Sequence, residues 1–508
     1  MFFLILIAIV FFASLLAVYF VRKFAYNNNF TKSQQKDRWH KGVVALYGGV
    51  GFIPIFLLAS LVYMWFQLPG DYRLILSLDR NHEILVLFGV LSGTLLMFFV
   101  GIVDDVKSLG TKNKLFFQAV ATSIFLIFSD VVFIDGHPLV NTFVTYFWFI
   151  GIINAVNLLD NMDGLASGVV IISLLAAIYF ILESSIGLQS FSWKIIFLLI
   201  ASTIAFWFYN FPPASIFMGD SGSLSLGFLL AAFCSPNPLN SYFLPVDTNS
   251  YSVFIGLAIS VAIVSVPIFD TAFVTITRKL EARKITQGGK DHTSHRLLVL
   301  GAIESKVLLF FYILSIVGVG TAILITKYPT YWVPLFIFLL LMMLLLGIYL
   351  GRIKVSESDS DGVNFYAKSN QFAAVIMDIG LISVCFYVAH LVRFGADLSN
   401  ELVNLLYTSL PIVIGASIAS FGFFGIYNRK WSSISISDYF TFMKGAFGAL
   451  VLSVALVTLF FRFPDGNSRS VFVVYSLLLF PVSFLARFSF NFLENLLVKT
   501  LNINLEKK

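Results

Sequence analysis

The sequence is poor in charge. Asp, Glu, Lys and Arg make up only 12% of its 508 residues, whereas soluble domains carry about 25%. Hydrophobic residues reach 58%, so an ordinary soluble domain is excluded. Apolar stretches of about 20 residues recur along the chain, which is the length of a helix that crosses a bilayer. Because the short alternating segments of a β-barrel are missing, we expect an all-α polytopic membrane protein.

Cysteine is nearly absent, with only Cys234 and Cys385, each in an apolar run. Two isolated thiols do not make a disulfide framework or a metal site, so we interpret both as small buried hydrophobic residues. The segment 48–51 lacks the glycine spacing and the preceding strand of a dinucleotide-binding fold. The net charge of +6 does not indicate nucleic-acid binding, since the Lys and Arg residues lie in loops between apolar spans.

The distribution of Lys and Arg predicts the topology. The first apolar stretch lacks a basic N-terminal region and is followed by Arg22 and Lys23, so we expect a retained helix with its N-terminus outside. The basic loops at 22–42 and 278–304 then fall inside, whereas the loop at 235–251, which has no Lys or Arg, falls outside. This asymmetry follows the positive-inside rule.

Fifteen membrane spans are expected from the apolar stretches, in two groups separated by a polar and acidic segment. The predicted organisation is a membrane domain at 1–350, a linker at 351–370 and a four-helix membrane domain at 371–508. The eleven expected spans of the first group lie near 2–21, 43–66, 83–103, 114–134, 139–156, 165–183, 194–210, 214–234, 252–277, 305–326 and 329–350. Those of the second group lie near 371–393, 405–426, 440–462 and 471–495.

Polar residues concentrate in four short segments, which this topology places together on the inner side. Carboxylates beside membrane helices are energetically expensive, so such a cluster indicates a functional site. Aspartate and asparagine suit a hard cation, whereas His, Arg and Lys suit phosphates. The combination indicates diphosphate chemistry. The segments are Asp104-Asp105, Asn154–Leu165, Phe217–Gly222 and Asp291–Arg296.

The first two segments are rich in oxygen ligands. The adjacent carboxylates of Asp104 and Asp105 could attract a divalent cation or orient an incoming phosphate; a solvated helix cap is the alternative. Asn157, Asp160 and Asp163 are spaced three apart, so one helical turn would place them on one face. That donor set suits Mg²⁺, and a polar loop with a helix cap is again the alternative.

The other two segments could bind a nucleotide and its phosphates. Phe217 precedes Asp220 by three residues, so it is either a core or lipid-facing aromatic or a stacking surface for a nucleobase. His292, His295 and Arg296 supply cationic donors for phosphate oxygens, with Arg296 as a bidentate clamp. Zinc binding by the two histidines is the alternative, but it lacks thiolates or a well-spaced third ligand.

In this order and spacing, the motifs of residues 1–350 resemble the polyprenyl-phosphate N-acetylhexosamine-1-phosphate transferases, the sugar-transferase branch of glycosyltransferase family 4. The resemblance implies that a lipid phosphate attacks the β-phosphorus of a UDP-sugar and releases UMP at the cytoplasmic face. The matching residues are Arg38–Lys41, Gly48-Gly49, Gly101–Asp105, Lys114, Gln118, Asn154–Leu165, Asn210–Gly222, Pro267–Thr271 and His292–Leu297.

The same resemblance implies roles for individual residues. Mg²⁺, or Mn²⁺ in its place, would be held by Asp163 and Asp220. The implied catalytic residues are Asp104, Asp105, Asp160, Asp163 and His295. The implied substrate-binding residues are Lys114, Asn157, Asn210, Phe217, His292 and Arg296.

Residues from about 370 onward resemble the four-helix membrane region in front of nucleotide-sugar dehydratase and epimerase domains, although no Rossmann domain is expected after it. The match is carried by Asp378, Arg393, Tyr427, Asp438 and Arg487. The expected partners are a UDP-sugar, polyprenyl (undecaprenyl) phosphate and membrane lipid, with a dehydratase or epimerase and a second copy of the chain as candidate protein partners. The expected location is the bacterial inner membrane.

Two alternatives remain open at this stage. A phospho-N-acetylmuramoyl-pentapeptide translocase would carry a triple-histidine signature, which the segment 292–296 lacks. A transporter or non-catalytic scaffold would place its acidic residues near helix centres on both sides of the membrane midplane, whereas here they gather in loops.

Overall fold

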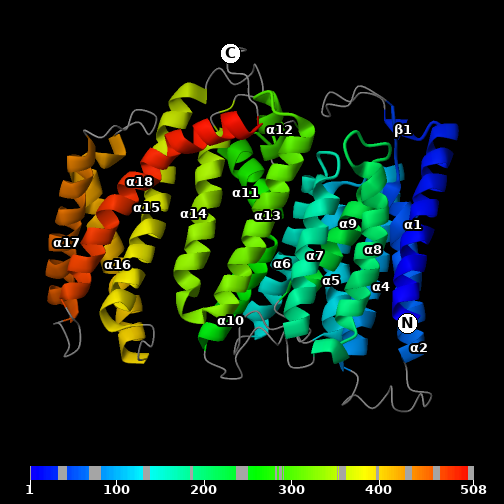
Figure 1. The fold of residues 1–508 in the computed structure, drawn as a ribbon, viewed down its shortest axis with the longest axis horizontal. Coiled ribbons are helices and arrows are strands. Elements are labelled where there is room, and N and C mark those ends of the chain that lie inside the picture. The colour runs from blue at the N-terminus through cyan, green and yellow to red at the C-terminus, as the bar shows by residue number, and fades with distance from the viewer. Residues whose placement is uncertain are drawn as a thin grey trace. The chain divides into compact units, whose positions relative to one another are not determined.

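The computed structural model describes most of the chain as helices (Figure 1). These helices group into two compact units, one formed by Met1–His295 with Glu304–Ile323 and the other by Arg296–Ile303 with Leu324–Lys508. The described residues are 2–32, 43–67, 82–129, 138–183, 187–235, 250–280, 283–284, 289, 291–351, 353, 362–395, 400–428, 438–461 and 469–501.

The first unit is a helical bundle with a small two-stranded antiparallel sheet at one end. Its helices are α1 (Phe2–Asn27), α2 (Gly48–Gln67), α4 (His82–Val106), α5 (Thr111–Phe128), α6 (Pro138–Leu159), α7 (Leu165–Glu183), α8 (Ser192–Asn210), α9 (Asp220–Phe233), α10 (Ser250–Ile263) and α11 (Ser265–Leu280), with the short η1 (Gly187–Gln189). The strands are β1 (Thr31–Lys32) and β2 (Val44–Ala45). Helices α12 (Thr293–Val299) and α13 (Glu304–Lys327) contribute residues to both units.

The second unit is built from η3 (Pro329–Tyr331), α14 (Trp332–Gly351), α15 (Gly362–Phe394), α16 (Asn400–Phe423), η5 (Ile426–Asn428), α17 (Tyr439–Phe461) and α18 (Ser470–Leu501). Its apolar core gathers buried side chains from α15 to α18. The division of contacts places α14 in this unit, and α15 begins within the expected linker at 351–370. The compact units therefore divide the chain at other residues than 350 and 371. The domain limits predicted from sequence stay a prediction.

The predicted all-α polytopic class is confirmed. Among the described residues, twelve helices are long and apolar enough to cross a membrane. The bent pair α10–α11, if counted as one span, gives a thirteenth. Each of the fifteen expected spans corresponds to a helix or to this pair, which bends by 82° at its break. The other two expected spans are α5 and α9; α9 is apolar but has only 14 residues.

Helix α9 is the buried centre of the first unit, since every residue from Ser221 to Phe233 is buried. It packs against α4, α6 and α2. Its first turns are rich in Ser and Gly, which let neighbouring backbones approach closely as in other membrane bundles. A Cβ atom at Gly227 would lie only 2.8 Å from Cα of Ile153 on α6. Small residues therefore set how tightly α9 is enclosed.

A buried ion pair joins α15 to α18 in the second unit. Arg487 Nη2 and Nη1 donate to the two carboxylate oxygens of Asp378 at 2.6 and 2.9 Å. Both side chains are fully enclosed, with exposed fractions of 1% and 0%. The guanidinium also lies 5.3 Å from the ring centroid of Phe442 on α17. Three helices of this unit thus meet at one charged pair.

We expect Arg487→Met to lower the melting temperature of the detergent-solubilised protein strongly, because removing one partner leaves a buried charge at a cost of about 3–5 kcal/mol. The double variant Asp378→Leu/Arg487→Met should recover much of that loss, since it buries no unpaired charge. Scanning fluorimetry measures both, with Arg393→Met at an exposed position as the control. A double variant less stable than Arg487→Met would contradict this reasoning.

Candidate active site

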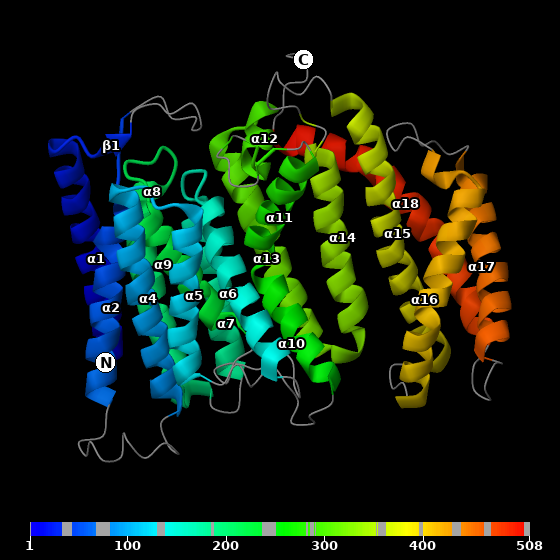
Figure 2. The same ribbon diagram turned by 180° about the vertical axis from the view of Figure 1, so that it is seen from behind.

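Three helix junctions of the first unit lie at the same end of the bundle as the sheet: α4 to α5, α6 to α7 and α8 to α9 (Figures 1 and 2). The polar segments predicted to lie together are therefore brought to one end. The sheet contributes to this end directly, because the backbone N–H of Phe217 donates to the carbonyl of Ala45 at 2.9 Å. The segment 38–41, part of the family resemblance, lies outside the described residues.

Lys114, at the start of α5, bridges two carboxylates from different helices. Its Nζ lies 2.5 Å from Asp104 Oδ2 on α4 and 2.8 Å from Asp220 Oδ2 on α9. Asn157 of α6 donates from Nδ2 to the other oxygen of Asp220 and to Ser223 Oγ, both at 2.9 Å. Four helices thus converge on the Asp220 carboxylate. The predicted grouping of Asp104, Lys114, Asn157 and Asp220 agrees with this geometry.

Asp105 holds the start of α9. Its carboxylate accepts hydrogen bonds from the backbone N–H groups of Asp220 at 2.7 Å and Ser221 at 3.0 Å. These N–H groups have no partner within their own helix, and the helix N-terminus attracts negative charge. The residue before them, Gly219, has φ +75°, and a Cβ atom there would lie 2.8 Å from Asp105 Oδ2. Asp105 therefore positions Asp220, and a direct chemical role for it stays a prediction.

The donor set around Asp220 fits Mg²⁺. Mg²⁺ uses one or two protein carboxylates and completes its shell with water and substrate phosphate. Asp104 and Asp220 present such oxygens on either side of one ammonium group, so this position already accommodates positive charge. Among the described residues, no group of three or more His, Cys, Asp or Glu side chains gathers as a protein-only metal cage.

Asp160 and Asp163 follow α6, where the chain turns toward α7. Asp160 is partly buried. Asp163 is 8% exposed, and its Oδ2 accepts a hydrogen bond from the backbone N–H of Ala214 at 2.9 Å. Asp163 thereby ties the turn after α6 to the segment between α8 and α9. Metal binding by Asp163 stays a prediction.

The turn at Gly164 is held from both sides. Asn210 Oδ1 accepts its N–H at 2.9 Å, and the Tyr312 hydroxyl of α13 donates to its carbonyl at 2.6 Å. Trp207 Nε1 donates to that hydroxyl at 2.9 Å. Gly164 has φ +73°, which favours glycine. Asn210, predicted to contact uridine, is thus 2% exposed and bound to the scaffold, so its substrate contact stays a prediction.

Phe217 lies in a small apolar cluster with Val44 and Ala214 and is 5% exposed. Its surroundings match the core alternative, and nucleobase stacking by this ring stays a prediction.

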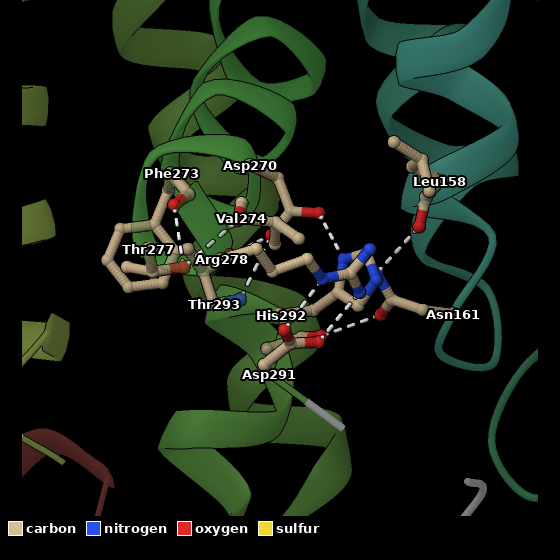
Figure 3. A network of polar contacts seen from close by, with 11 residues as sticks. Leu158, Asn161, Asp270, Phe273, Val274, Thr277, Arg278, Asp291, His292 and Thr293 are labelled. Carbon is tan, nitrogen blue, oxygen red and sulfur yellow. Dashed lines mark hydrogen bonds and ion pairs between the residues drawn. The ribbon is translucent and has the colours of Figure 1, made fainter. Parts of the chain in front are cut away.

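A second polar network links α11 to α12 (Figure 3). Asp270 Oδ2 lies 2.8 Å from His292 Nδ1, and Asp270 Oδ1 accepts the N–H and the hydroxyl of Thr293 at 3.0 and 2.5 Å. Arg278 binds both oxygens of Asp291, at 2.7 and 2.8 Å. Burial alone would raise the pKa of Asp291, but Arg278 and Arg283 lower it to about 2.

Helix α12 is also joined to the turn after α6, since Ser294 Oγ donates to Asn161 Oδ1 at 2.6 Å. The fourth predicted segment is thereby brought to the second. His295 is buried, and its ring centroid lies 6.2 Å from that of His292. Arg296 donates from Nη1 to the carbonyls of Ile353 at 2.6 Å and Leu350 at 3.3 Å and is 2% exposed. Its predicted role as a phosphate clamp has no support in these contacts and stays a prediction.

Sequence reasoning gave no role to Asp270, Arg278 or Tyr312. For Asp270 a signal existed, because a carboxylate inside an apolar span is a functional candidate by itself. Arg278 and Tyr312 gave no comparable signal: the sequence places Arg278 among the basic residues of the expected loop 278–304, and Tyr312 is one aromatic residue among many.

Comparison with known proteins identifies the group to which this site belongs. The family model described as glycosyl transferase family 4 matches residues 87–235. A probable undecaprenyl-phosphate N-acetylglucosaminyl 1-phosphate transferase of Bacillus subtilis is 34% identical over 269 residues, covering 49% of this chain and 68% of the relative. The chain belongs to glycosyl transferase family 4.

Two further relatives of this family 4 protein are sugar-phosphate transferases. A decaprenyl-phosphate N-acetylglucosaminephosphotransferase of Mycobacterium leprae is 30% identical over 308 residues, covering 55% of this chain and 72% of the relative. A phospho-N-acetylmuramoyl-pentapeptide-transferase of Streptococcus agalactiae is 33% identical over 217 residues, covering 39% of this chain and 60% of the relative. The protein is therefore a membrane transferase. The matched residues 87–235 run from α4 to the end of α9 and include the Lys114 bridge.

The contact of α4 with the start of α9 makes Gly101 a sharp test of the site. A Cβ atom there would lie 2.4 Å from the Asp220 carbonyl oxygen and 2.4 Å from Ser221 Cα. We expect Gly101→Ala to displace Asp220 and lower transferase activity at least about tenfold, since small misplacements of catalytic groups are costly. The control is Gly151→Ala on α6, where a Cβ atom would meet nothing within 4 Å. Equal activities of the two variants would contradict the expectation.

Proposed function

We propose that this family 4 transferase moves an N-acetylhexosamine-1-phosphate from a UDP-sugar to undecaprenyl phosphate and releases UMP, as the first step of a lipid-linked cell-surface polysaccharide. The names of the relatives support the polyprenyl phosphate acceptor and the sugar-phosphate product. The observation that carries the proposal is the Lys114 bridge between Asp104 and Asp220 at the ends of apolar helices. The basic loops 22–42 and 278–304 support a cytoplasmic site in the bacterial inner membrane.

The residues of the bridge divide the chemistry among them. A phosphate oxygen of the lipid attacks the β-phosphorus, the bond to the bridging oxygen breaks, and UMP leaves with that oxygen. Asp220, supported by Asn157, would hold Mg²⁺, which supplies neutralisation of the diphosphate charge when bound. Asp104 would orient the lipid phosphate or take its proton. Lys114 keeps both carboxylates in place and contributes positive charge to a site that must accept two anionic substrates.

We expect detergent-purified protein to release UMP only when a UDP-N-acetylhexosamine, undecaprenyl phosphate and Mg²⁺ are all present. Asp220→Asn should lower the rate at least about 100-fold, because the neutral amide weakens both metal binding and the Lys114 bridge. EDTA should abolish the release, and Mn²⁺ should restore part of it. The matched control is Asp438→Asn in the second unit.

UMP release by Asp220→Asn at the wild-type rate would contradict the proposed role of this carboxylate. Release of UMP without the lipid would contradict the proposed acceptor.

We also propose that the chain forms homodimers, and that residues 371–508 dock a nucleotide-sugar dehydratase or epimerase. The docked enzyme would supply a modified UDP-sugar beside the transferase. The resemblance of residues 371–508 to the membrane region of such enzymes supports the docking role. A tagged chain should co-purify with that enzyme from native membranes, and deletion of residues 371–508 should abolish the co-purification. Retention of the enzyme by the truncated chain would contradict the docking role.

A further inference from the structure

Helix α11 binds three consecutive residues, Asp291, His292 and Thr293. Asp270 and Arg278 both belong to α11. Arg278 binds Asp291 through two hydrogen bonds, and Asp270 binds both His292 and the first residue of α12, Thr293. His292 therefore lies between two anchored neighbours and is itself anchored through its ring.

The Asp270 carboxylate is fully enclosed, with an exposed fraction of 0%, and its two oxygens have different partners. Oδ1 accepts the N–H and hydroxyl of Thr293, whereas Oδ2 lies 2.8 Å from His292 Nδ1. A buried carboxylate facing a ring nitrogen needs a proton between them, and an ionised carboxylate only accepts. The proton therefore lies on Nδ1, and Nε2 is the remaining nitrogen of the ring.

The position of α12 brings Ser294, two residues after His292, to the turn that carries Asp160 and Asp163. Ser294 is bound to Asn161, which lies in the same turn as Asp160 and Asp163. His292 is thus held at a helix end that is tied to the oxygen-rich segment, rather than at an isolated place in the bundle.

We propose that Asp270 is a positioning residue that holds the Nδ1–H of His292 and so presents Nε2 to a phosphate group of the substrates. This inference rests on the proposed function for its catalytic consequence. The proton stays on Nδ1 while Nε2 accepts or donates a hydrogen bond to phosphate, and the Asp270 charge stabilises the imidazolium whenever Nε2 is protonated. The arrangement gives His292, the residue directly before α12, a ring nitrogen of fixed orientation.

The variant Asp270→Asn separates orientation from folding. Its amide oxygen can still accept the Thr293 N–H, which leaves the amide NH₂ facing His292 Nδ1 and forces the opposite tautomer. Replacement of an orienting carboxylate by its amide preserves geometry and costs up to about 10⁴ in kcat in a serine protease triad. We expect a loss of about 10²–10⁴ in kcat here, with KM for the UDP-sugar changed less than about threefold.

A double-mutant cycle tests whether Asp270 acts through His292. His292→Asn keeps a nitrogen donor near Asp270 but removes Nε2, so it should lose about as much kcat as Asp270→Asn. Adding Asp270→Asn to it should then change kcat less than about threefold. Thr277→Val is the control on α11, because among the described residues its hydroxyl donates to backbone carbonyls of the same helix, those of Phe273 and Val274. Independent, additive losses would overturn the proposal.

The tautomer can be measured without any activity. The chain has six histidines, so a spectrum of protein labelled with ¹⁵N-histidine is simple, and His292→Asn assigns the signal of interest. We expect Nδ1 of His292 to carry a proton in the wild-type protein and to lose it in Asp270→Asn. An unprotonated Nδ1 in the wild type, or no change in the variant, would overturn the proposal. An inactive wild type with the expected spectrum would instead contradict the proposed function alone.

Discussion

The ammonium group of Lys114 neutralises two carboxylates that come from separate helices. The position of α9 at the centre of the first unit depends on this ion-pair bridge. Asp104 lies in the last turn of α4 and Asp220 begins α9, and each lies within hydrogen-bond distance of Nζ. Unpaired charge beside apolar helices is costly, so the bridge stabilises the approach of these helix ends. The cap that Asp105 provides for α9 fixes the same junction through the backbone.

The same design recurs at α11 and α12, where an ion pair and a buried carboxylate hold the residues around His292. In both places, the residue suited to meet the substrate is oriented by a charged residue from a neighbouring helix. Such preorganisation is effective in transfer between phosphates, where positioning and charge neutralisation supply most of the catalysis. The fixed charges of Lys114, Asp104 and Asp220 thus lie in place without any bound substrate.

The helices were predictable because apolar length is a local property of the sequence, and the spacing of Lys and Arg was enough to place the polar segments at one end. The grouping of Asp104, Lys114, Asn157 and Asp220 followed from that topology and from the family resemblance. The burial of Phe217 and Arg296 was not predictable, because it depends on how each helix is rotated against its neighbours. The cap by Asp105 and the anchoring by Asp270 and Tyr312 depend equally on side-chain contacts between helices. The short α9 was expected as a span because its hydropathy resembles that of one, although its role is to form the buried centre.

The most direct test of the account is the fate of the β-phosphorus. UDP-N-acetylhexosamine labelled with ³²P at the β-position and ¹⁴C in the sugar would be incubated with the purified protein, undecaprenyl phosphate and Mg²⁺. The lipid product would then be extracted and counted. The account predicts that both labels enter the lipid in equal amounts. Carbon label without phosphorus would show transfer of the sugar alone, with release of UDP, and would contradict attack on the β-phosphorus.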